Sequence, residues 1–135
     1  MRNIIIFFFI LVSIRCGSDL LNVKAVTVPE LYNNIKENNV SSLVLLNIWS
    51  TSCIPCIEEF PYIVKLKKRY DINKLDVVFL STDWDENEEA AENFLLSQKV
   101  KGQHYRKLEG NTQEFIDDIC PSWSGALPFT GIFNQ

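Results

Sequence analysis

The sequence has little of several features that mark large protein classes. It has one histidine, no excess of basic residues, and no apolar run of the roughly 20 residues that a membrane-spanning helix needs. Lysine and arginine total 13 against 17 acids, and this balance argues against a nucleic-acid partner. The chain also lacks internal repeats and low-complexity segments. Its 135 residues, 47% of them hydrophobic, therefore predict one domain with its own core.

The first 16 residues predict a signal peptide. An unbroken apolar run, Ile4 to Val12, follows the basic residue Arg2, as in the apolar region of such signals. Residues 13–18 resemble a bacterial lipoprotein cleavage site, with Cys16 as the lipidated residue. Arg15 stands where a small residue is usual, so ordinary cleavage nearby and an uncleaved apolar tether stay open. Each alternative predicts an extracytoplasmic domain, and lipid at Cys16 or the uncleaved apolar segment would anchor it on the periplasmic side of a bacterial membrane.

The remaining chain predicts a linker over residues 17–25 and one α/β domain over residues 26–135. Apolar periodicity predicts helices over residues 29–38, 53–70, 85–98 and 112–119. It predicts strands over residues 25–28, 43–49, 75–81, 104–108 and 128–133, the second and third of them buried. The strand, helix, strand order around residues 53–70 predicts a right-handed parallel crossover. The basic residues at the end of that helix are interpreted as a solvated end that complements the helix dipole.

Two cysteines, Cys53 and Cys56, lie where the strand predicted over residues 43–49 leads into the next helix. The first turn of a helix has unpaired N–H groups and partial positive charge, so a cysteine there is stabilised as thiolate, the form that attacks disulfides. Cys56 lies one turn further along the same face, within reach to resolve a mixed disulfide. Pro55 fits the first turn, which needs no proline N–H. The pattern predicts thiol-disulfide exchange, with Cys53 as nucleophile and Cys56 as resolving thiol.

Other uses of the two cysteines stay open at this point. A structural zinc site would need two more ligands, and the candidates Cys16, Cys120 and His104 are not at ligand spacing. A static disulfide would make the domain a non-catalytic interaction module. We therefore expect no metal and no organic cofactor. Cys120 is a third thiol, either buried or close to the active site through the loop that follows it.

Two segments carry a resemblance to a known family. Residues 47–56, Asn-Ile-Trp-Ser-Thr-Ser-Cys-Ile-Pro-Cys, followed by Glu-Glu-Phe-Pro at 58–61, resemble the active-site stretch of the membrane-anchored thioredoxin-like oxidoreductases of the TlpA, ResA and DsbE type. Residues 125–130, Gly-Ala-Leu-Pro-Phe-Thr, resemble the segment with that family's cis-proline. The resemblance implies a three-layer α/β/α fold with a central mixed sheet and a Cys53–Cys56 disulfide. It also implies a protein disulfide as substrate and an upstream thiol donor as partner.

The resemblance assigns roles to further residues. It implies a cis Leu127–Pro128 bond beside Cys53, where the residue-127 backbone can pair with an extended substrate chain; the alternative is a plain proline at a strand start. Glu59 matches the family's glutamate near the cysteines, whose negative charge would raise the thiol pKa values and which would relay a proton; the alternative is a surface acid. Trp49 is expected to pack beside the disulfide and shape the partner surface, or to be plain core.

Two expectations concern features particular to this chain. Ile54 and Pro55 place no charge or histidine between the cysteines, so the helix terminus alone lowers the Cys53 pKa; this predicts a reducing couple and thus a reductant of protein disulfides. The family normally continues into one more strand and a C-terminal helix, which we expect to be missing after Gln135. A truncated remnant is therefore an alternative. A peroxiredoxin-type peroxidase, which uses its cysteine in a different sequence setting, is the remaining enzymatic alternative.

Overall fold

The computed structural model describes residues 21–38, 41–70 and 74–134. The predicted signal segment, Cys16 and residues 17–20 of the predicted linker lie outside these ranges. Within them, no helix is both long and apolar enough to cross a membrane. The elements are β1 (Leu21–Val26), α1 (Val28–Asn38), β2 (Leu43–Trp49), α2 (Ile54–Arg69), β3 (Leu75–Ser81), the 3-10 helix η1 (Asp85–Asn87), α3 (Glu88–Ser97), β4 (Gly102–Lys107), α4 (Thr112–Ile119) and β5 (Phe129–Asn134).

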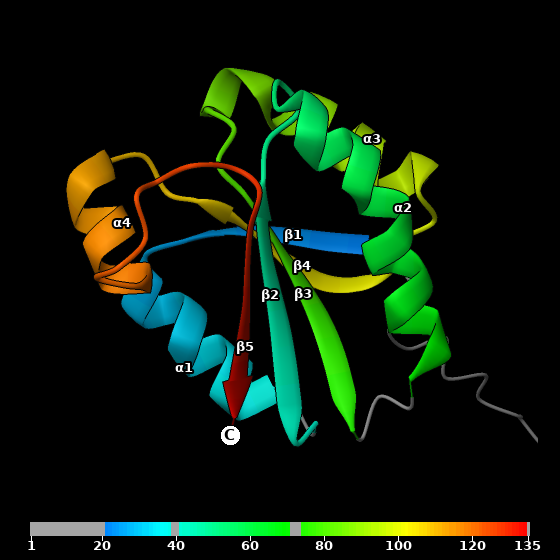
Figure 1. Cartoon of the computed structure of the whole chain (residues 1–135). Helices are drawn as coiled ribbons and strands as arrows, with labels where there is room; N and C mark the ends of the chain where they lie inside the picture. The colour runs from blue at the N-terminus through cyan, green and yellow to red at the C-terminus, as the bar shows by residue number, and fades with distance from the viewer. Residues whose placement is uncertain (1–20, 39–40, 71–73, 135) are drawn as a thin grey trace, which may run out of the picture.

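The described strands form one mixed sheet in the order β1-β4-β3-β2-β5 (Figure 1). β5 runs antiparallel to β2, and the other neighbours are parallel. The β2–β3 pair joined by α2 is the predicted parallel crossover. Register places Asn47 of β2 opposite Thr130 of β5. The predicted mixed α/β sheet is confirmed, and its topology brings the segment after β2 beside the segment before β5.

Two helices cover each face of the sheet, which gives three layers (Figure 1). α1 and α4 pack on one face, against Val44, Leu46 and Ile48 of β2. α2 and α3 pack on the other face, against Leu45 and Trp49 of the same strand. β2 is therefore buried on both sides, which is why its sequence is a continuous apolar run instead of an alternating one. Ile48 and Trp49, at the end of this strand, are 0% exposed, and Cys53 follows four residues after Trp49.

The predicted linker is wrong in its second half. Residues 21–26 form β1, which pairs in parallel with β4 from Leu21 opposite Gly102 to Val26 opposite Lys107. β1 lies at an edge of the sheet, and exposed Asn22 and Lys24 alternate with more buried neighbours. This short edge strand lacks the long apolar run that identified β2 and β3, and its alternation of apolar and polar residues, which is the pattern of a half-buried strand, was not used to predict it.

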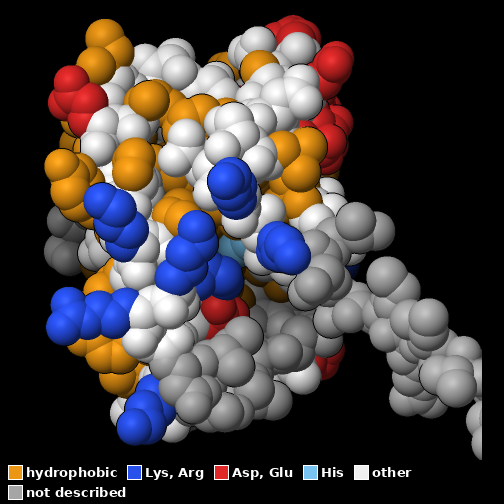
Figure 2. Space-filling model, turned by 90° about the vertical axis from the view of Figure 1, so that its right-hand side faces the viewer, with side chains coloured by type: hydrophobic (Ala, Val, Ile, Leu, Met, Phe, Trp, Pro, Cys, Tyr) orange, Lys and Arg blue, Asp and Glu red, His pale blue; other side chains and the backbone are white. Residues whose placement is uncertain are grey.

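Charge is unevenly distributed over the face covered by α2 and α3 (Figure 2). Asp85, Glu86 and the first residues of α3 place acids at one end of this face, and Lys67, Lys68 and Arg69 form the last turn of α2. Lys67 pairs with Asp76 at 2.7 Å and donates to the carbonyl of Val77 at 2.7 Å. The basic run thus ends a helix next to its carbonyl-rich terminus, as the dipole argument predicted.

Candidate active site

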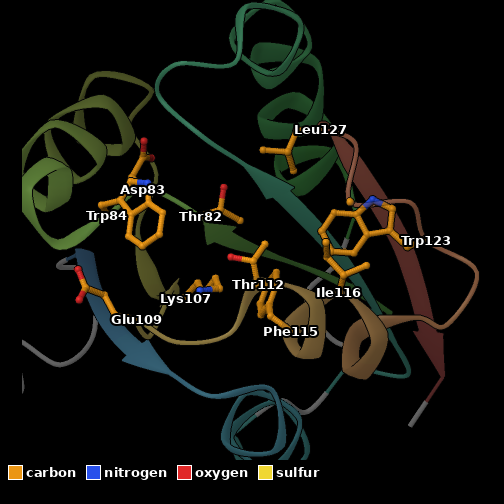
Figure 3. Close-up of a pocket in the computed structure, with 11 residues that line it drawn as sticks. Thr82, Asp83, Trp84, Lys107, Glu109, Thr112, Phe115, Ile116, Trp123 and Leu127 are labelled. Atoms are coloured by element: carbon orange, nitrogen blue, oxygen red, sulfur yellow. The ribbon is translucent and has the colours of Figure 1, made fainter.

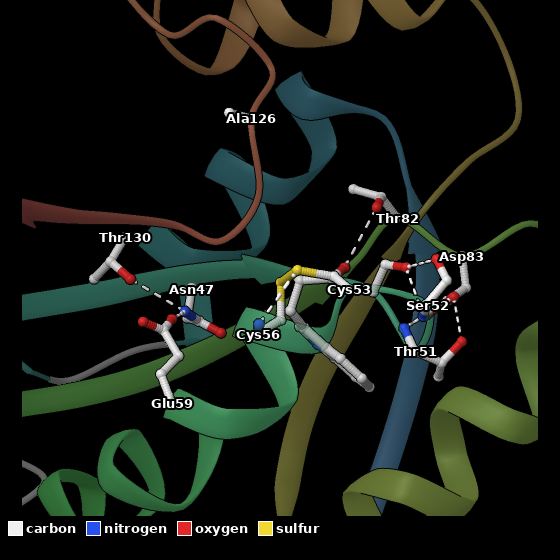
Figure 4. Close-up of a disulfide and its surroundings, with 12 residues drawn as sticks. Asn47, Thr51, Ser52, Cys53, Cys56, Glu59, Thr82, Asp83, Ala126 and Thr130 are labelled. Atoms are coloured by element: carbon white, nitrogen blue, oxygen red, sulfur yellow. Dashed lines mark hydrogen bonds between the residues drawn. A yellow bond between two sulfur atoms is a disulfide. The ribbon is translucent and has the colours of Figure 1, made fainter.

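Cys53 and Cys56 are joined in a disulfide at the start of α2 (Figure 4). Cys53 is the N-cap residue, with extended backbone angles, and its Sγ accepts a hydrogen bond from the Cys56 N–H at 3.3 Å. Pro55 lies in the first turn, as predicted. Cys53 is half-buried, whereas Cys56 is 1% exposed. The sulfur at the helix terminus is therefore also the one that a partner can reach.

The loop before β5, which carries Ala126, lies across from the disulfide (Figure 4). The Leu127–Pro128 bond in this loop is cis, in agreement with the sequence expectation. Trp123 anchors the loop by donating its Nε1–H to the Ala126 carbonyl at 2.9 Å. Gly125 has φ +83°, and a Cβ there would come within 2.5 Å of the Ile116 side chain, so the path of the loop requires glycine. The half-buried Leu127 packs against the cores on both faces of the sheet.

One polar cluster connects α2, β2 and β5 on one side of the disulfide. The buried Asn47 donates through Nδ2 to Glu59 Oε1 at 3.0 Å and to Thr130 Oγ1 at 3.1 Å (Figure 4). Glu59 is half-buried and lies three residues after Cys56 on the same helix, one turn away. The expectation that this carboxylate is partly buried near the cysteines fits its position. Asn47 and Thr130 were quoted in the sequence motif but received no role there.

A second polar cluster fixes the loop that leads into Cys53 (Figure 4). The buried carboxylate of Asp83 accepts from the Thr51 N–H at 3.0 and 3.1 Å, from the Thr51 hydroxyl at 2.6 Å and from the Ser81 hydroxyl at 2.6 Å. Thr82 adds a backbone hydrogen bond to the Trp49 carbonyl at 2.9 Å. The segment Ser81–Asp83 therefore holds residues 49–51 in place, immediately before the nucleophile.

Sequence reasoning missed Asp83, although a signal for it was present. Ser81, Thr82 and Asp83 are polar residues at the end of a predicted buried strand that is parallel to the strand before the cysteines. The carboxyl ends of neighbouring parallel strands meet at one edge of a sheet, where ligands usually bind in such folds. The sequence could therefore have predicted that these polar residues lie close to residues 50–53.

Trp49 is part of the core beneath the disulfide. Its ring is fully buried and lies 5.0 Å from the rings of Phe60 and Phe94, in the same apolar cluster as Cys56. Among the described residues its Nε1–H has no hydrogen-bond partner. The expectation that Trp49 packs with the cysteine pair is met, but a fully buried ring does not shape the surface that a partner meets.

Two of the remaining zinc candidates, His104 and Cys120, lie on other elements than the cysteine pair, and Cys16 lies outside the described residues. His104 is buried on β4; its Nδ1 accepts from the Phe79 N–H at 3.1 Å, and its Nε2 lies 3.1 Å from the Lys101 carbonyl. Burial lowers the pKa of His104 to about 4. Cys120 is a half-exposed free thiol at the end of α4, where hydrogen bonding with Ser122 lowers its pKa. No set of three or more potential metal ligands gathers anywhere in the described segments.

No protein-family model matches the chain, but comparison with known proteins finds curated relatives and solved structures that are similar to it. The chain is 38% identical over 58 residues to the thiol-disulfide oxidoreductase ResA of a Bacillus cereus strain and 36% identical to ResA of Bacillus thuringiensis subsp. konkukian. Each match covers 43% of this chain and 32% of the relative. The matched stretch thus spans about a third of the length of these curated relatives.

Solved structures share the fold over most of the chain. A thioredoxin-related protein from Neisseria meningitidis serogroup B has a TM-score of 0.59 at 26% identity, covering 73% of this chain and 70% of that one. A DsbF homologue from Corynebacterium diphtheriae has a TM-score of 0.56 at 18% identity, covering 74% and 60%, respectively. The fold of this chain is therefore shared with a thioredoxin-related protein and with a DsbF homologue.

Proposed function

The chain has a thioredoxin-like fold and resembles the thiol-disulfide oxidoreductases of the ResA and DsbE type; from this premise we propose that it reduces protein disulfides through Cys53 and Cys56. The observation that carries the proposal is the difference between the two sulfurs. Cys53 is half-buried and caps α2, where the helix terminus stabilises a thiolate, while Cys56 is 1% exposed. This difference supports Cys53 as the cysteine that attacks a partner and Cys56 as the one that completes the reaction.

The reaction begins from the reduced dithiol. The Cys53 thiolate attacks one sulfur of the substrate disulfide, a mixed disulfide forms, and the other substrate sulfur leaves as a thiolate. Cys56 then loses its proton and attacks the Cys53 sulfur, which releases the second substrate sulfur and closes the Cys53–Cys56 bond. Two electrons pass from the protein to the substrate, whose thiolates take up protons. An upstream thiol donor must reduce the disulfide again before the next cycle.

Glu59 is the proposed proton acceptor for the second step. Its carboxylate lies one helical turn from Cys56, and the Asn47 amide orients it. Its negative charge opposes formation of a second thiolate nearby, so it favours the protonated Cys56 until the mixed disulfide has formed. This charge, together with the uncharged Ile54–Pro55 pair between the cysteines, supports a reducing couple.

The proposal also includes the localisation of the protein. The apolar segment before Cys16 supports export, and lipidation at Cys16 or retention of the segment itself would hold the domain at the extracytoplasmic face of a bacterial membrane. Such a compartment is where disulfides form in exported proteins and where a reductant has substrates. The partners are then an exported protein with a disulfide and a membrane-side thiol donor.

Two measurements test the proposed function, both in a Cys120→Ser background. In Cys56→Ser the mixed disulfide cannot be resolved, so substrate proteins should stay trapped on Cys53; Cys53→Ser, whose remaining thiol is buried, should trap far less. Equal trapping by the two variants, or trapping by neither, would contradict the assignment. A redox titration followed by tryptophan fluorescence should give a two-electron transition near or below about −270 mV, the thioredoxin value.

The titration also separates the alternatives. A midpoint near about −120 mV would make the protein an oxidant instead of a reductant. The absence of any reversible transition would favour a static disulfide in a non-catalytic module.

A further inference from the structure

A pocket of about 160 Å³ lies between the β3–η1 segment and the loop before β5 (Figure 3). Trp84 forms one side and Trp123 the opposite side, with Phe115 and Ile116 of α4 and the side chain of Leu127 completing the apolar lining. Trp84 is 54% exposed, although it is a large aromatic side chain beside a hollow. The pocket is thus open to solvent and bordered by rings.

Some of the residues that line the pocket also belong to, or contact, the segments next to the disulfide. Thr82 and Asp83 line the pocket, and the same two residues hydrogen-bond to Trp49 and Thr51, just before Cys53. Leu127 also lines the pocket, and it directly precedes the cis-proline of the loop that faces the disulfide. A chain bound across the disulfide therefore passes the mouth of the pocket.

Two charged side chains of the pocket lining, Asp83 and Lys107, are already engaged within the protein. Asp83 accepts its four hydrogen bonds from Thr51 and Ser81. Lys107 lies over the rings of Trp84 and Phe115, at 5.8 and 5.5 Å from their centroids, and donates to the carbonyls of Leu108 and Gly110 at 3.3 and 3.4 Å. Its charge is thus partly satisfied by ring faces and carbonyls, which argues against an anion as the occupant and leaves ring surfaces as the available contacts.

The size of the pocket fits a single ring. An apolar cavity of about 150 Å³ accommodates benzene, and rings prefer offset or edge contacts with other aromatic groups. We propose that this pocket binds an aromatic side chain of the substrate protein, next to the cysteine that Cys53 attacks. The inference rests on the proposed function and extends it to substrate selection. An extended chain shows alternate side chains on the same face, so the aromatic residue lies two positions from the substrate cysteine.

The test uses the reduced full chain with Cys120→Ser and short peptides whose cysteine carries 2-nitro-5-thiobenzoate as a mixed disulfide. Peptides with phenylalanine or alanine two positions before or after the cysteine are compared by the rate of release of the coloured thiolate. We expect phenylalanine at one of these positions to speed the reaction about ten-fold, the discrimination that a modest apolar contact supplies. Equal rates for the phenylalanine and alanine peptides would overturn the proposal.

Three variants locate the effect. Trp84→Ala removes one wall of the pocket, and Thr112→Phe introduces a ring from the residue that starts α4 and lines the hollow. Each should bring the ratio of the two peptide rates down to about two-fold or less. Tyr62→Ala removes an exposed aromatic ring of α2 outside the pocket and should leave the ratio at its wild-type value. A ratio that survives in both pocket variants would overturn the assignment to this pocket.

Two controls separate this inference from the proposed function. If the reduced protein fails to react even with a small disulfide such as oxidised glutathione, the proposed function fails by itself. Binding of peptides with serine in place of cysteine, measured by the change in tryptophan fluorescence, then tests the pocket without any redox step. The phenylalanine peptide should bind at least several-fold more tightly than the alanine peptide; equal binding would overturn the pocket proposal whatever the redox result.

Discussion

Glu59 and Asp83 lie on opposite sides of the disulfide and are held in opposite ways (Figure 4). Asp83 is buried and accepts four hydrogen bonds from Thr51 and Ser81. Glu59 is half-buried, and in the described part of the chain its hydrogen bond comes from the Asn47 amide. A carboxylate whose oxygens are all engaged by donors is stabilised as an anion and serves as a structural anchor. A carboxylate with open positions can still accept a proton.

The comparison teaches that proximity to the cysteines does not by itself assign a chemical role. Asp83 reaches the nucleophile through the backbone and hydroxyl of Thr51, so it positions the loop before Cys53. Glu59 lies one turn after Cys56 on the same helix, so the role we propose for its charge is to act on the thiol itself. The number and kind of hydrogen-bond donors distinguish an anchor from a candidate acid-base group, and substitution of each carboxylate tests that distinction.

Removing the Asp83 anchor should have the largest effect on stability. Asp83→Ala leaves the Thr51 N–H and the hydroxyls of Thr51 and Ser81 without their charged acceptor, which we expect to cost about 4 kcal/mol in urea unfolding of the oxidised protein. Asp83→Asn keeps the shape but turns a donor toward these donors, so it should cost nearly as much. A loss below about 1 kcal/mol in both variants would contradict the anchor role.

The second prediction concerns His104 on β4, whose protonation should make the free energy of unfolding depend on pH. Burial lowers its pKa from 6.5 to about 4, so the unfolded chain binds a proton between these values while the folded protein does not. Stability should therefore fall as the pH decreases from about 6.5 to about 4, by about 3 kcal/mol from this group. Unfolding free energies measured across this range check the prediction.

His104→Asn is the matched control for that pH dependence. Its amide oxygen can still accept from the Phe79 N–H, but it carries no group that titrates in this range. The variant should be less stable than the wild type at pH 7, and the difference between them should shrink toward pH 4. A constant difference would show that His104 does not contribute the pH dependence.

Replacing Glu59 should change reactivity far more than stability. Glu59→Gln keeps an oxygen that can accept from Asn47, so we expect a change in unfolding free energy below about 1 kcal/mol. Loss of the negative charge near Cys56 should shift the pH profile of thiol alkylation in the reduced protein to lower pH. Asp83→Asn should leave that midpoint in place. The distinction between the carboxylates fails if both variants move the profile equally.

Much of the fold follows from local pattern. The apolar run over residues 43–49 gave the correct bounds of β2, and residues 75–81 and 112–119 gave those of β3 and α4. Elements that are buried on both faces or on one helical stripe leave a periodic signal in the sequence. β1 leaves little signal because an exposed edge strand needs few apolar residues. The 3-10 turn at Asp85–Asn87 was likewise merged into the predicted helix.

The candidate site likewise contains some features that the sequence could predict and some contacts that it could not. The Cys-x-x-Cys spacing and the proline in the first turn are local features, recognisable from neighbouring residues alone, whereas the cis Leu127–Pro128 bond was expected from the family resemblance. Other contacts of the site join distant parts of the chain. Asn47 and Thr130 are separated by 83 positions in the sequence, and Thr51 and Asp83 by 32 positions. Hydrogen bonds of this kind depend on strand order and register, which no single stretch of sequence specifies.

The sequence by itself determined that a strand delivers a cysteine pair to a helix terminus, because burial and helix periodicity are properties of neighbouring residues. The place of Leu127 and Pro128 near that pair was expected only from the family resemblance, because the residues alone also fit a plain proline at a strand start. The tertiary structure alone decided which carboxylate became an anchor and where two tryptophans enclose a pocket. These outcomes depend on side chains from distant segments meeting at one edge of the sheet, and only the packed fold sets that geometry.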